Sequence, residues 1–165
     1  KINFNKSKKN LIICPFGSYN KKNLEIKEYS KIIKGLSEKF DIYIIGGKKE
    51  ETELKLLAEQ AGLDSEKVLA GTLNLQELSA LIKLSTVLLS VDTGPMHIAQ
   101  GVNTPVVALF GPTDPAVWGP RNSHDYIIYK NIECSPCWGK GTCEDNICME
   151  KIDAIEVIAK ICEFY

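Results

Sequence analysis

The sequence predicts an α/β protein with a doubly wound, mostly parallel, Rossmann-like sheet. Short apolar runs alternate along the chain with segments in which apolar residues recur every three or four positions. This alternation of strand and helix patterns is typical of a parallel sheet with helices on both faces. Glycine- and proline-rich turns follow several of the apolar runs. With 165 residues, 44% of them apolar, the chain is long enough for one well-packed domain, and we expect residues 1–165 to form it.

The first two strand and helix pairs are expected in the first 62 residues. Residues 11–14 form an apolar run that predicts a strand. A helix is predicted over 26–40 from apolar residues at three- and four-residue spacing: Ile26, Tyr29, Ile32, Ile33, Leu36 and Phe40. The second strand is expected at 42–45, and the second helix at about 50–61, where Gly62 is a suitable C-terminal stop.

The middle of the chain continues the same alternation. A short strand is expected at 68–70, followed by a helix over 75–84 with Asn74 as its N-cap. Two apolar runs, 87–91 and 105–110, then flank a short helical segment. Together they form a strand-turn-helix-strand unit.

The last part of the chain is less regular. A sixth strand is expected at 126–129 and a final helix at 153–164. Between them, residues 131–149 form a loop that holds four of the six cysteines.

Charge and composition exclude several classes of protein. Twenty basic and twenty-one acidic residues leave a net charge of −1, so no global attraction to nucleic acid or to an anionic membrane is expected. No apolar run approaches the roughly 20 residues of a transmembrane helix, and the basic N-terminus lacks the apolar core of a signal peptide. A domain of this size is stable without disulfides, so its cysteines fit a reducing cytoplasm.

The turn after the strand at 87–91 reads Asp92-Thr93-Gly94-Pro95-Met96-His97. Gly94 removes a side chain where an anion must come close, and Thr93 offers a hydroxyl and an N–H. Pro95 suits the first helical position, because its missing N–H would have no intrahelical partner. The turn therefore predicts an anion-binding helix start. An ordinary turn capped by Asp92 fits as well, and His97 is either a phosphate or sugar contact or a core or capping histidine.

Other strand-end turns carry side chains that could join the same site. Ser18 ends a turn that Lys21 and Lys22 follow, and lysine is a point charge suited to phosphate. Glu50 follows Gly46-Gly47, and its carboxylate can accept paired hydrogen bonds from ribose hydroxyls. A third turn, 110–115, is stiffened by two prolines. Ligands of open parallel sheets bind outside the carboxyl ends of strands, so we expect one crevice here.

Each of these turns also has a plainer interpretation. The lysines could belong to a solvated polar loop, and Glu50 could be an exposed residue that stabilises a helix start through the helix dipole. The chain has no G-x-G-x-x-G after a strand, no G-x-x-x-x-G-K-[ST] and no nucleophile elbow. These absences argue against a hydride-transfer enzyme, a P-loop NTPase and an α/β-hydrolase.

The cysteines of the 131–149 loop are Cys134, Cys137, Cys143 and Cys148. Cys-x-x-Cys is a common half of a zinc site, but the second half of a zinc ribbon usually lies about 15–20 residues further on. Three interpretations stay open: a structural Zn²⁺ or similar metal site, free thiols packed in a loop, or disulfides.

Three segments carry a resemblance to a known family. They are Asp-Thr-Gly-Pro-Met-His-Ile-Ala at 92–99, Thr-Pro-Val-Val-Ala-Leu-Phe-Gly-Pro-Thr-Asp-Pro at 104–115 and Trp-Gly-Pro at 118–120. They resemble the C-terminal domain of glycosyltransferase family 9, the ADP-heptose:lipopolysaccharide heptosyltransferases. The turn at 15–18 with its lysines is similar to the family's Pro-Gly-Ala-Ser loop and Lys, although Phe16 and Gly17 depart from it. The cysteine loop has counterparts in family members as well.

The resemblance implies a GT-B architecture, in which two Rossmann-like domains hold the active site between them. This chain matches the second, donor-binding domain, and the N-terminal acceptor domain is absent from it. Thr93, Gly94 and His97 would contact the donor diphosphate, Lys21 or Lys22 would reach the phosphates or the acceptor side, and Glu50 would hold the adenosine ribose. The donor-binding set as a whole comprises Ser18, Lys21, Lys22, Glu50, Asp92, Thr93, Gly94, Pro95 and His97.

The implied reaction is inverting transfer of heptose from ADP-heptose to a lipopolysaccharide core acceptor, without a cofactor or catalytic metal ion. The family's general base is an Asp of the N-terminal domain, so we expect no catalytic residue here and no activity of the isolated domain. The resemblance further implies a cytoplasmic location, at the inner face of the bacterial inner membrane, with peripheral membrane association of the full protein.

Two alternatives remain. One is the donor domain of another GT-B glycosyltransferase, or a nucleotide-sugar epimerase, that uses a different nucleotide. The other is a metal-binding interaction module built on the cysteine loop.

Overall fold

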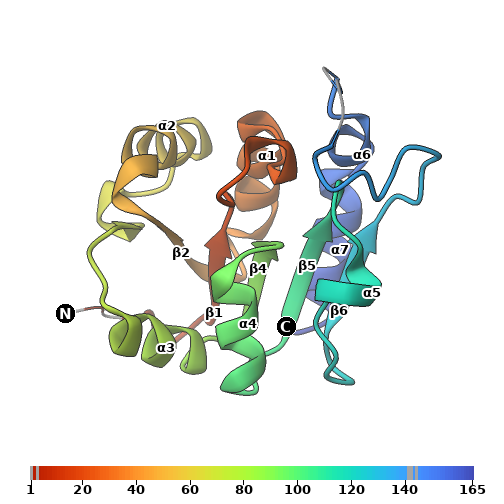
Figure 1. The fold of residues 1–165 in the computed structure, drawn as a ribbon. Helices are drawn as coiled ribbons and strands as arrows, with labels where there is room; N and C mark the ends of the chain where they lie inside the picture. The colour runs from red at the N-terminus through yellow and green to blue at the C-terminus, as the bar shows by residue number, and fades with distance from the viewer. Residues whose placement is uncertain (1, 3, 141–142, 144) are drawn as a thin grey trace.

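The computed structural model describes residues 2, 4–140, 143 and 145–165, and its centre is a six-stranded parallel sheet (Figure 1). The strand order is β3-β2-β1-β4-β5-β6, and all five strand pairs are parallel. This is the order of a doubly wound dinucleotide-binding fold, in which the chain reverses direction across the sheet between β1 and β4. The predicted fold class is confirmed, and the sheet is wholly rather than mostly parallel.

The strands are β1 (Lys9–Cys14), β2 (Phe40–Gly46), β3 (Val68–Ala70), β4 (Val87–Val91), β5 (Val106–Phe110) and β6 (Tyr126–Tyr129). The α-helices are α1 (Ile26–Leu36), α2 (Glu51–Ala61), α3 (Leu75–Lys83), α4 (Gly94–Gly101), α5 (Pro115–Trp118), α6 (Ile147–Glu150) and α7 (Ala154–Cys162). Single-turn 3-10 helices lie at η1 (Asn20–Lys22), η2 (Lys48–Glu50) and η3 (Ser65–Lys67).

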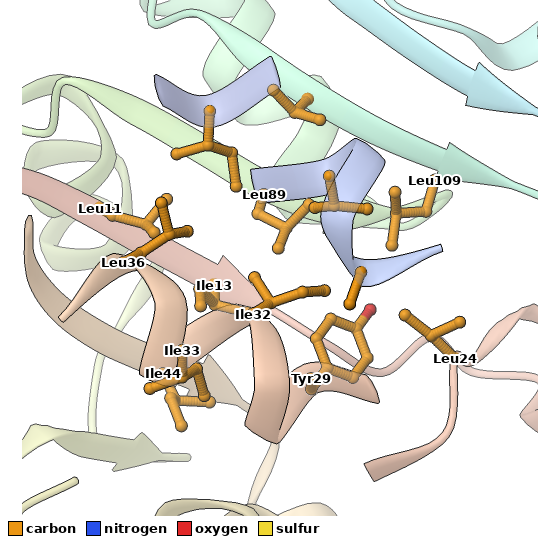
Figure 2. Close-up of a cluster of buried hydrophobic side chains, with 14 of the residues drawn as sticks. Leu11, Ile13, Leu24, Tyr29, Ile32, Ile33, Leu36, Ile44, Leu89 and Leu109 are labelled. Atoms are coloured by element: carbon orange, nitrogen blue, oxygen red, sulfur yellow. The ribbon is translucent and has the colours of Figure 1, made fainter. Parts of the chain in front are cut away.

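Alternate residues of the central strands enter two separate cores. Leu11 and Ile13 of β1 pack into the core beneath α1, α2 and α7, whereas Ile12 and Cys14 pack into the core beneath α3 and α4. This two-residue alternation is the period of a strand, and burial on both faces explains why the central strands are apolar throughout. Figure 2 shows the first core, where the apolar stripe of α1 meets the strands: Tyr29, Ile32, Ile33 and Leu36 lie beside Leu11, Ile13, Ile44 and Leu89.

Local capping residues set several helix ends as the sequence predicts. The Asn74 side chain accepts a hydrogen bond from the Glu77 N–H at 2.9 Å, and the Glu77 carboxylate accepts from the Asn74 N–H at 2.8 Å. This reciprocal capping box satisfies two helix-start donors of α3. Gly62 ends α2 in the left-handed conformation, with φ 68°.

The predicted helix over 26–40 is too long. Helix α1 ends at Leu36, and Phe40 is the first residue of β2. Phe40 is buried in the same core as the apolar stripe of α1, so its spacing fits a helix although it belongs to a strand. The apolar pattern does not reveal the short helices α5 and α6, and α7 ends at Cys162 rather than at 164.

Because the strands are parallel, the turns that follow β1, β2, β4 and β5 lie along one edge of the sheet. Within the part of the chain that the structure describes, no helix is both long enough and apolar enough to cross a membrane.

Gly71 is the turn residue that most constrains this edge. It has φ +63°, and its N–H donates to the Gly46 carbonyl at 2.8 Å. A Cβ at this position would lie 2.8 Å from the backbone nitrogen of Lys48 and 2.9 Å from its Cα. The turn after β3 therefore approaches η2 more closely than any other amino acid would allow.

We expect Gly71→Ala to lower the free energy of unfolding by more than about 2 kcal/mol, because the left-handed backbone costs about 1–2 kcal/mol and the backbone contact adds to it. Gly62→Ala is the matched control: Gly62 has φ +68°, but no atom lies within 4 Å of an added Cβ. Its loss should be about 1 kcal/mol. Urea unfolding monitored by circular dichroism measures both values, and equal losses would contradict the role of the Lys48 contact.

Candidate functional site

Two adjoining pockets open at the carboxyl edge of the sheet. The first, here the apolar pocket, has a volume of about 390 Å³ and lies between the turns that follow β1, β2, β3 and β4. The second, here the polar pocket, has a volume of about 490 Å³ and lies between the turns that follow β1, β4 and β5. Ser18 and Thr93 line both pockets, so the two form one crevice.

The apolar pocket is lined mainly by carbon-rich side chains and glycines. Its residues are Cys14, Phe16, Ser18, Ile45, Gly46, Gly47, Glu50, Leu69, Gly71, Leu73, Leu78, Thr93 and Pro95. Burial raises the pKa of the Cys14 thiol to about 12. This cysteine is therefore a neutral wall of the pocket rather than a nucleophile.

An ion pair between Lys22 and Asp92 forms one side of the polar pocket. The Lys22 Nζ lies 2.7 Å from Asp92 Oδ2 and 3.2 Å from the Asp92 carbonyl oxygen. The Asp92 residue is only 7% exposed, whereas 20% of the Lys22 side chain remains accessible. The buried carboxylate therefore holds the lysine cation at the pocket, where the cation can also meet a ligand.

The structure distinguishes the positions of Lys21 and Lys22, which the sequence alone could not do. Lys22 lines the polar pocket, whereas the Nζ of Lys21 donates a hydrogen bond to the Cys143 carbonyl. Lys21 lines neither pocket and instead ties the turn after β1 to the cysteine loop. Of the two lysines, Lys22 is therefore the one that lines the polar pocket.

Helix α4 begins at the floor of the polar pocket. Thr93 is its N-cap residue and makes no side-chain capping hydrogen bond, and Pro95 occupies the first turn. The carboxylate of Asp92 is bonded to Lys22. Asp92 therefore does not cap this helix, as the plainer interpretation of the turn had it. An added Cβ on Gly94 would find no atom within 4 Å. The helix start thus presents N–H groups and an open approach, as an anion site requires.

His97 lies on the first turn of α4 and lines the polar pocket. Its side chain is exposed, so it is not a core histidine. Its Nδ1 lies 3.3 Å from Gln100 Nε2, and its ring packs edge-on against Trp118 at a centroid distance of 6.3 Å.

Glu50 reaches the apolar pocket while it also caps a helix. Its Oε2 accepts a hydrogen bond from the Gly47 N–H at 2.7 Å. A Cβ on Gly46 would lie 2.7 Å from the same oxygen, so the glycine lets the carboxylate rest against the end of β2. The expected ligand-facing role and the plainer helix-start role are therefore compatible, since only one carboxylate oxygen is used by the cap.

Several residues of the polar pocket were not singled out from the sequence. Thr113 is one: its Oγ1 is buried and has no hydrogen-bond partner among the described residues. Its turn is stiffened by two prolines, but nothing in the local sequence pattern distinguishes this hydroxyl. Tyr19, Trp118 and Trp138 also line the pocket. Trp138 comes from the cysteine loop, and no local sequence signal connects that loop to the site.

The cysteine loop is fastened to two of the strand-end turns. The Trp138 N–H donates to the Pro112 carbonyl at 2.7 Å, and the Tyr19 hydroxyl donates to the Gly139 carbonyl at 3.4 Å. The Ser135 hydroxyl donates to the Gly111 carbonyl. These bonds hold Trp138 at the polar pocket.

The four cysteines of this loop are free thiols in the structure. Among the described residues, no three His, Cys, Asp or Glu side chains form a group that could hold a metal ion. The described residues contain no disulfide among Cys134, Cys137, Cys143 and Cys148, and a metal site formed by these four thiols stays a prediction. Residues 141, 142 and 144 of the loop lie outside the described residues. Burial, and in smaller part the neighbouring thiols, raise the pKa of Cys148.

The crevice suits a ligand that is flat and apolar at one end and anionic at the other. The apolar pocket can enclose a ring system, while Lys22 and the start of α4 offer positive charge to an anion next to it. Nucleotides have this construction.

Comparison with known proteins agrees with this geometry. The family model described as glycosyltransferase family 9 (heptosyltransferase) matches residues 1–148. The lipopolysaccharide core heptosyltransferase OpsX of Haemophilus influenzae is 31% identical over 125 residues, which are 74% of this chain and 36% of that protein.

Solved structures show the same fold. The Escherichia coli ADP-heptose lipopolysaccharide heptosyltransferase II superposes with a TM-score of 0.80 at 22% identity, over 97% of this chain and 47% of that one. The E. coli heptosyltransferase WaaC with ADP superposes with a TM-score of 0.76 at 18% identity, over 99% of this chain and 47% of that one.

The chain thus spans half or less of the length of these proteins. The match to the family model, in contrast, covers most of this chain, from the first residue to residue 148 of 165. The chain belongs to glycosyltransferase family 9.

Proposed function

We propose that this chain is the donor-binding domain of an inverting, metal-independent heptosyltransferase that moves heptose from ADP-heptose to a lipopolysaccharide core acceptor. The observation that carries the proposal is the crevice itself, in which a pocket of apolar lining adjoins the Lys22 cation and the start of α4. Family membership supports the reaction class, and the solved structure of a protein with the same fold contains ADP.

In this proposal the adenine ring occupies the apolar pocket and the diphosphate occupies the polar pocket. Glu50 accepts hydrogen bonds from the ribose hydroxyls with the carboxylate oxygen that its helix cap does not use. Thr93 and Gly94 bring backbone N–H groups to the phosphates, and Lys22 brings a positive charge. Ser18 and Pro95 line the wall along which the nucleotide lies.

These groups act on the leaving group. When the bond between the sugar and the diphosphate breaks, negative charge grows on the departing phosphate oxygen. The Lys22 cation and the N–H groups at the positive end of the α4 dipole stabilise that charge without reorganising. Inversion requires a base on the opposite face of the sugar to activate the acceptor hydroxyl.

We infer that a preceding domain supplies this base and the acceptor site, while residues 1–165 form one donor-binding domain. The chain alone should then bind ADP but not transfer the sugar. The full protein would work at the cytoplasmic face of the bacterial inner membrane, where its lipopolysaccharide acceptor is built.

The first prediction concerns the nucleotide. We expect ADP to raise the melting temperature more than UDP or GDP does, because the carbonyl and N–H groups of uracil and guanine would lose their water partners in an apolar pocket. At a hundred times its Kd, ADP should add about 2.7 kcal/mol of stability, or about 5–10 °C in a thermal-shift assay. An equal or larger shift with UDP or GDP would favour another GT-B donor domain or an epimerase.

The second prediction distinguishes the adjacent lysines. We expect Lys22→Met to weaken ADP binding by about 10- to 100-fold, because it removes a charged hydrogen-bond donor. Lys21→Met removes the same charge from the neighbouring residue, whose partner is the Cys143 carbonyl, and should change the Kd by less than about threefold.

Isothermal titration calorimetry measures both values. Lys22→Met also leaves the Asp92 carboxylate without its cation, so the double variant Lys22→Met/Asp92→Asn separates loss of the lysine from repulsion by the buried carboxylate. Equal weakening by the two single variants would contradict the assignment of Lys22.

The third prediction concerns space at the helix start. Gly94→Ala places a methyl group in the open part of the polar pocket, where it touches no protein atom within 4 Å. We expect ADP affinity to fall by about tenfold or more, because the methyl group occupies the approach of the phosphate. Stability should be unchanged or slightly higher, since alanine is the better helix former.

Gly101→Ala is the control for this change. Gly101 lies in the same helix, and an added Cβ there also meets nothing within 4 Å, but it lines neither pocket. The control should keep the wild-type Kd in calorimetry. A Gly94→Ala variant that binds ADP normally would show that the phosphates do not approach this turn.

A further inference from the structure

A short chain of hydrogen bonds runs along α4 to the edge of the polar pocket. The backbone N–H of Arg121 donates to Gln100 Oε1 at 3.2 Å. The amide nitrogen of Gln100 lies 3.3 Å from His97 Nδ1. Gln100 and His97 are three residues apart on one helix, where such side chains are neighbours.

The backbone N–H of Arg121 determines which atoms donate and which accept in the rest of this hydrogen-bond series. A backbone N–H can only donate, so the Gln100 atom that faces Arg121 must be the amide oxygen. The amide group that faces His97 is then the NH₂, which also can only donate. Nδ1 of His97 must therefore accept, and a neutral ring in this position carries its proton on Nε2.

The other side of the imidazole belongs to the ligand site. His97 lines the polar pocket, and its Nε2 has no hydrogen-bond partner among the residues that the structure describes. Trp118 packs edge-on against the same ring. With a proton on Nε2, the ring offers a hydrogen-bond donor to an anion. With the proton on Nδ1 it would present a lone pair, which an anion repels.

We propose that Gln100 is a positioning residue that holds His97 in the Nε2–H tautomer and so makes its imidazole a hydrogen-bond donor to the diphosphate of the sugar nucleotide. The identity of the ligand rests on the function proposed above. The tautomer of His97, in contrast, depends only on the hydrogen bonds that link Arg121, Gln100 and His97. Arg121 contributes through its backbone, so its side chain is dispensable.

The tautomer can be read directly by NMR. We would label the ring nitrogens of histidine with ¹⁵N and record a long-range ¹H–¹⁵N correlation spectrum at about pH 9, where imidazole rings are neutral. The chain has two histidines, so a His124→Asn variant assigns both sets of signals. The wild-type spectrum should show His97 protonated on Nε2.

Two substitutions of Gln100 test whether this residue determines the tautomer of His97. In Gln100→Glu the carboxylate can only accept, so the proton of His97 should move to Nδ1. In Gln100→Met no group faces Nδ1, so both tautomers should be populated. Gln60→Glu, on an exposed residue at the far end of α2, controls for the added charge and should leave the His97 spectrum unchanged.

Calorimetry with ADP links the tautomer to the ligand. We expect Gln100→Met to weaken ADP binding by about three- to fivefold, and Gln100→Glu by more. In a His97→Phe background, Gln100→Met should have no further effect, since it acts only through His97.

Three results would overturn the inference: a wild-type ring protonated on Nδ1, an unchanged tautomer in Gln100→Met, or a Gln100→Met effect that persists without His97. If the tautomers behave as expected but the wild-type chain does not bind ADP, the proposed function fails, and with it the role of Nε2–H toward a diphosphate.

Discussion

The parallel direction of all six strands is the constraint on which the rest of the structure depends. It places the carboxyl ends of β1, β2, β4 and β5 at one edge, so that segments up to 100 residues apart meet there. These turns contribute different kinds of group: Phe16 and Lys22 after β1, the Glu50 carboxylate after β2, the start of α4 after β4, and the Thr113 hydroxyl after β5. The crevice is therefore a property of the topology, and the side chains decide only what it can hold.

The pairing of Lys22 with Asp92 shows how charge is managed at this edge. A carboxylate that is 7% exposed would be costly on its own, and the lysine offsets this cost by direct contact. The lysine is held in turn at a fixed place beside the first turn of α4. Fixed charges of this kind are effective toward an anion, because little ordering remains to be done when the anion arrives.

Most of the fold and much of the site could be predicted from the sequence. Apolar periodicity identified the six strands, and turn chemistry identified Ser18, Glu50, Thr93 and Gly94, which all line the crevice. Periodicity failed at Phe40, because a buried strand residue one turn beyond a helix keeps the helical spacing.

The sequence could not choose between Lys21 and Lys22, since adjacent residues of η1 point in different directions and only the tertiary contacts reveal which. It also could not place Trp138 at the pocket or join Gln100 to Arg121, because these contacts join residues that lie far apart in the sequence.

The buried hydroxyl of Thr113 is a further feature that the sequence could not reveal. Among the described residues it has no hydrogen-bond partner, and leaving a buried group of this kind unpaired costs about 1–3 kcal/mol. A ligand group that bonds to it would recover that cost, so this threonine favours ligands that place a hydrogen-bonding group at its position in the polar pocket.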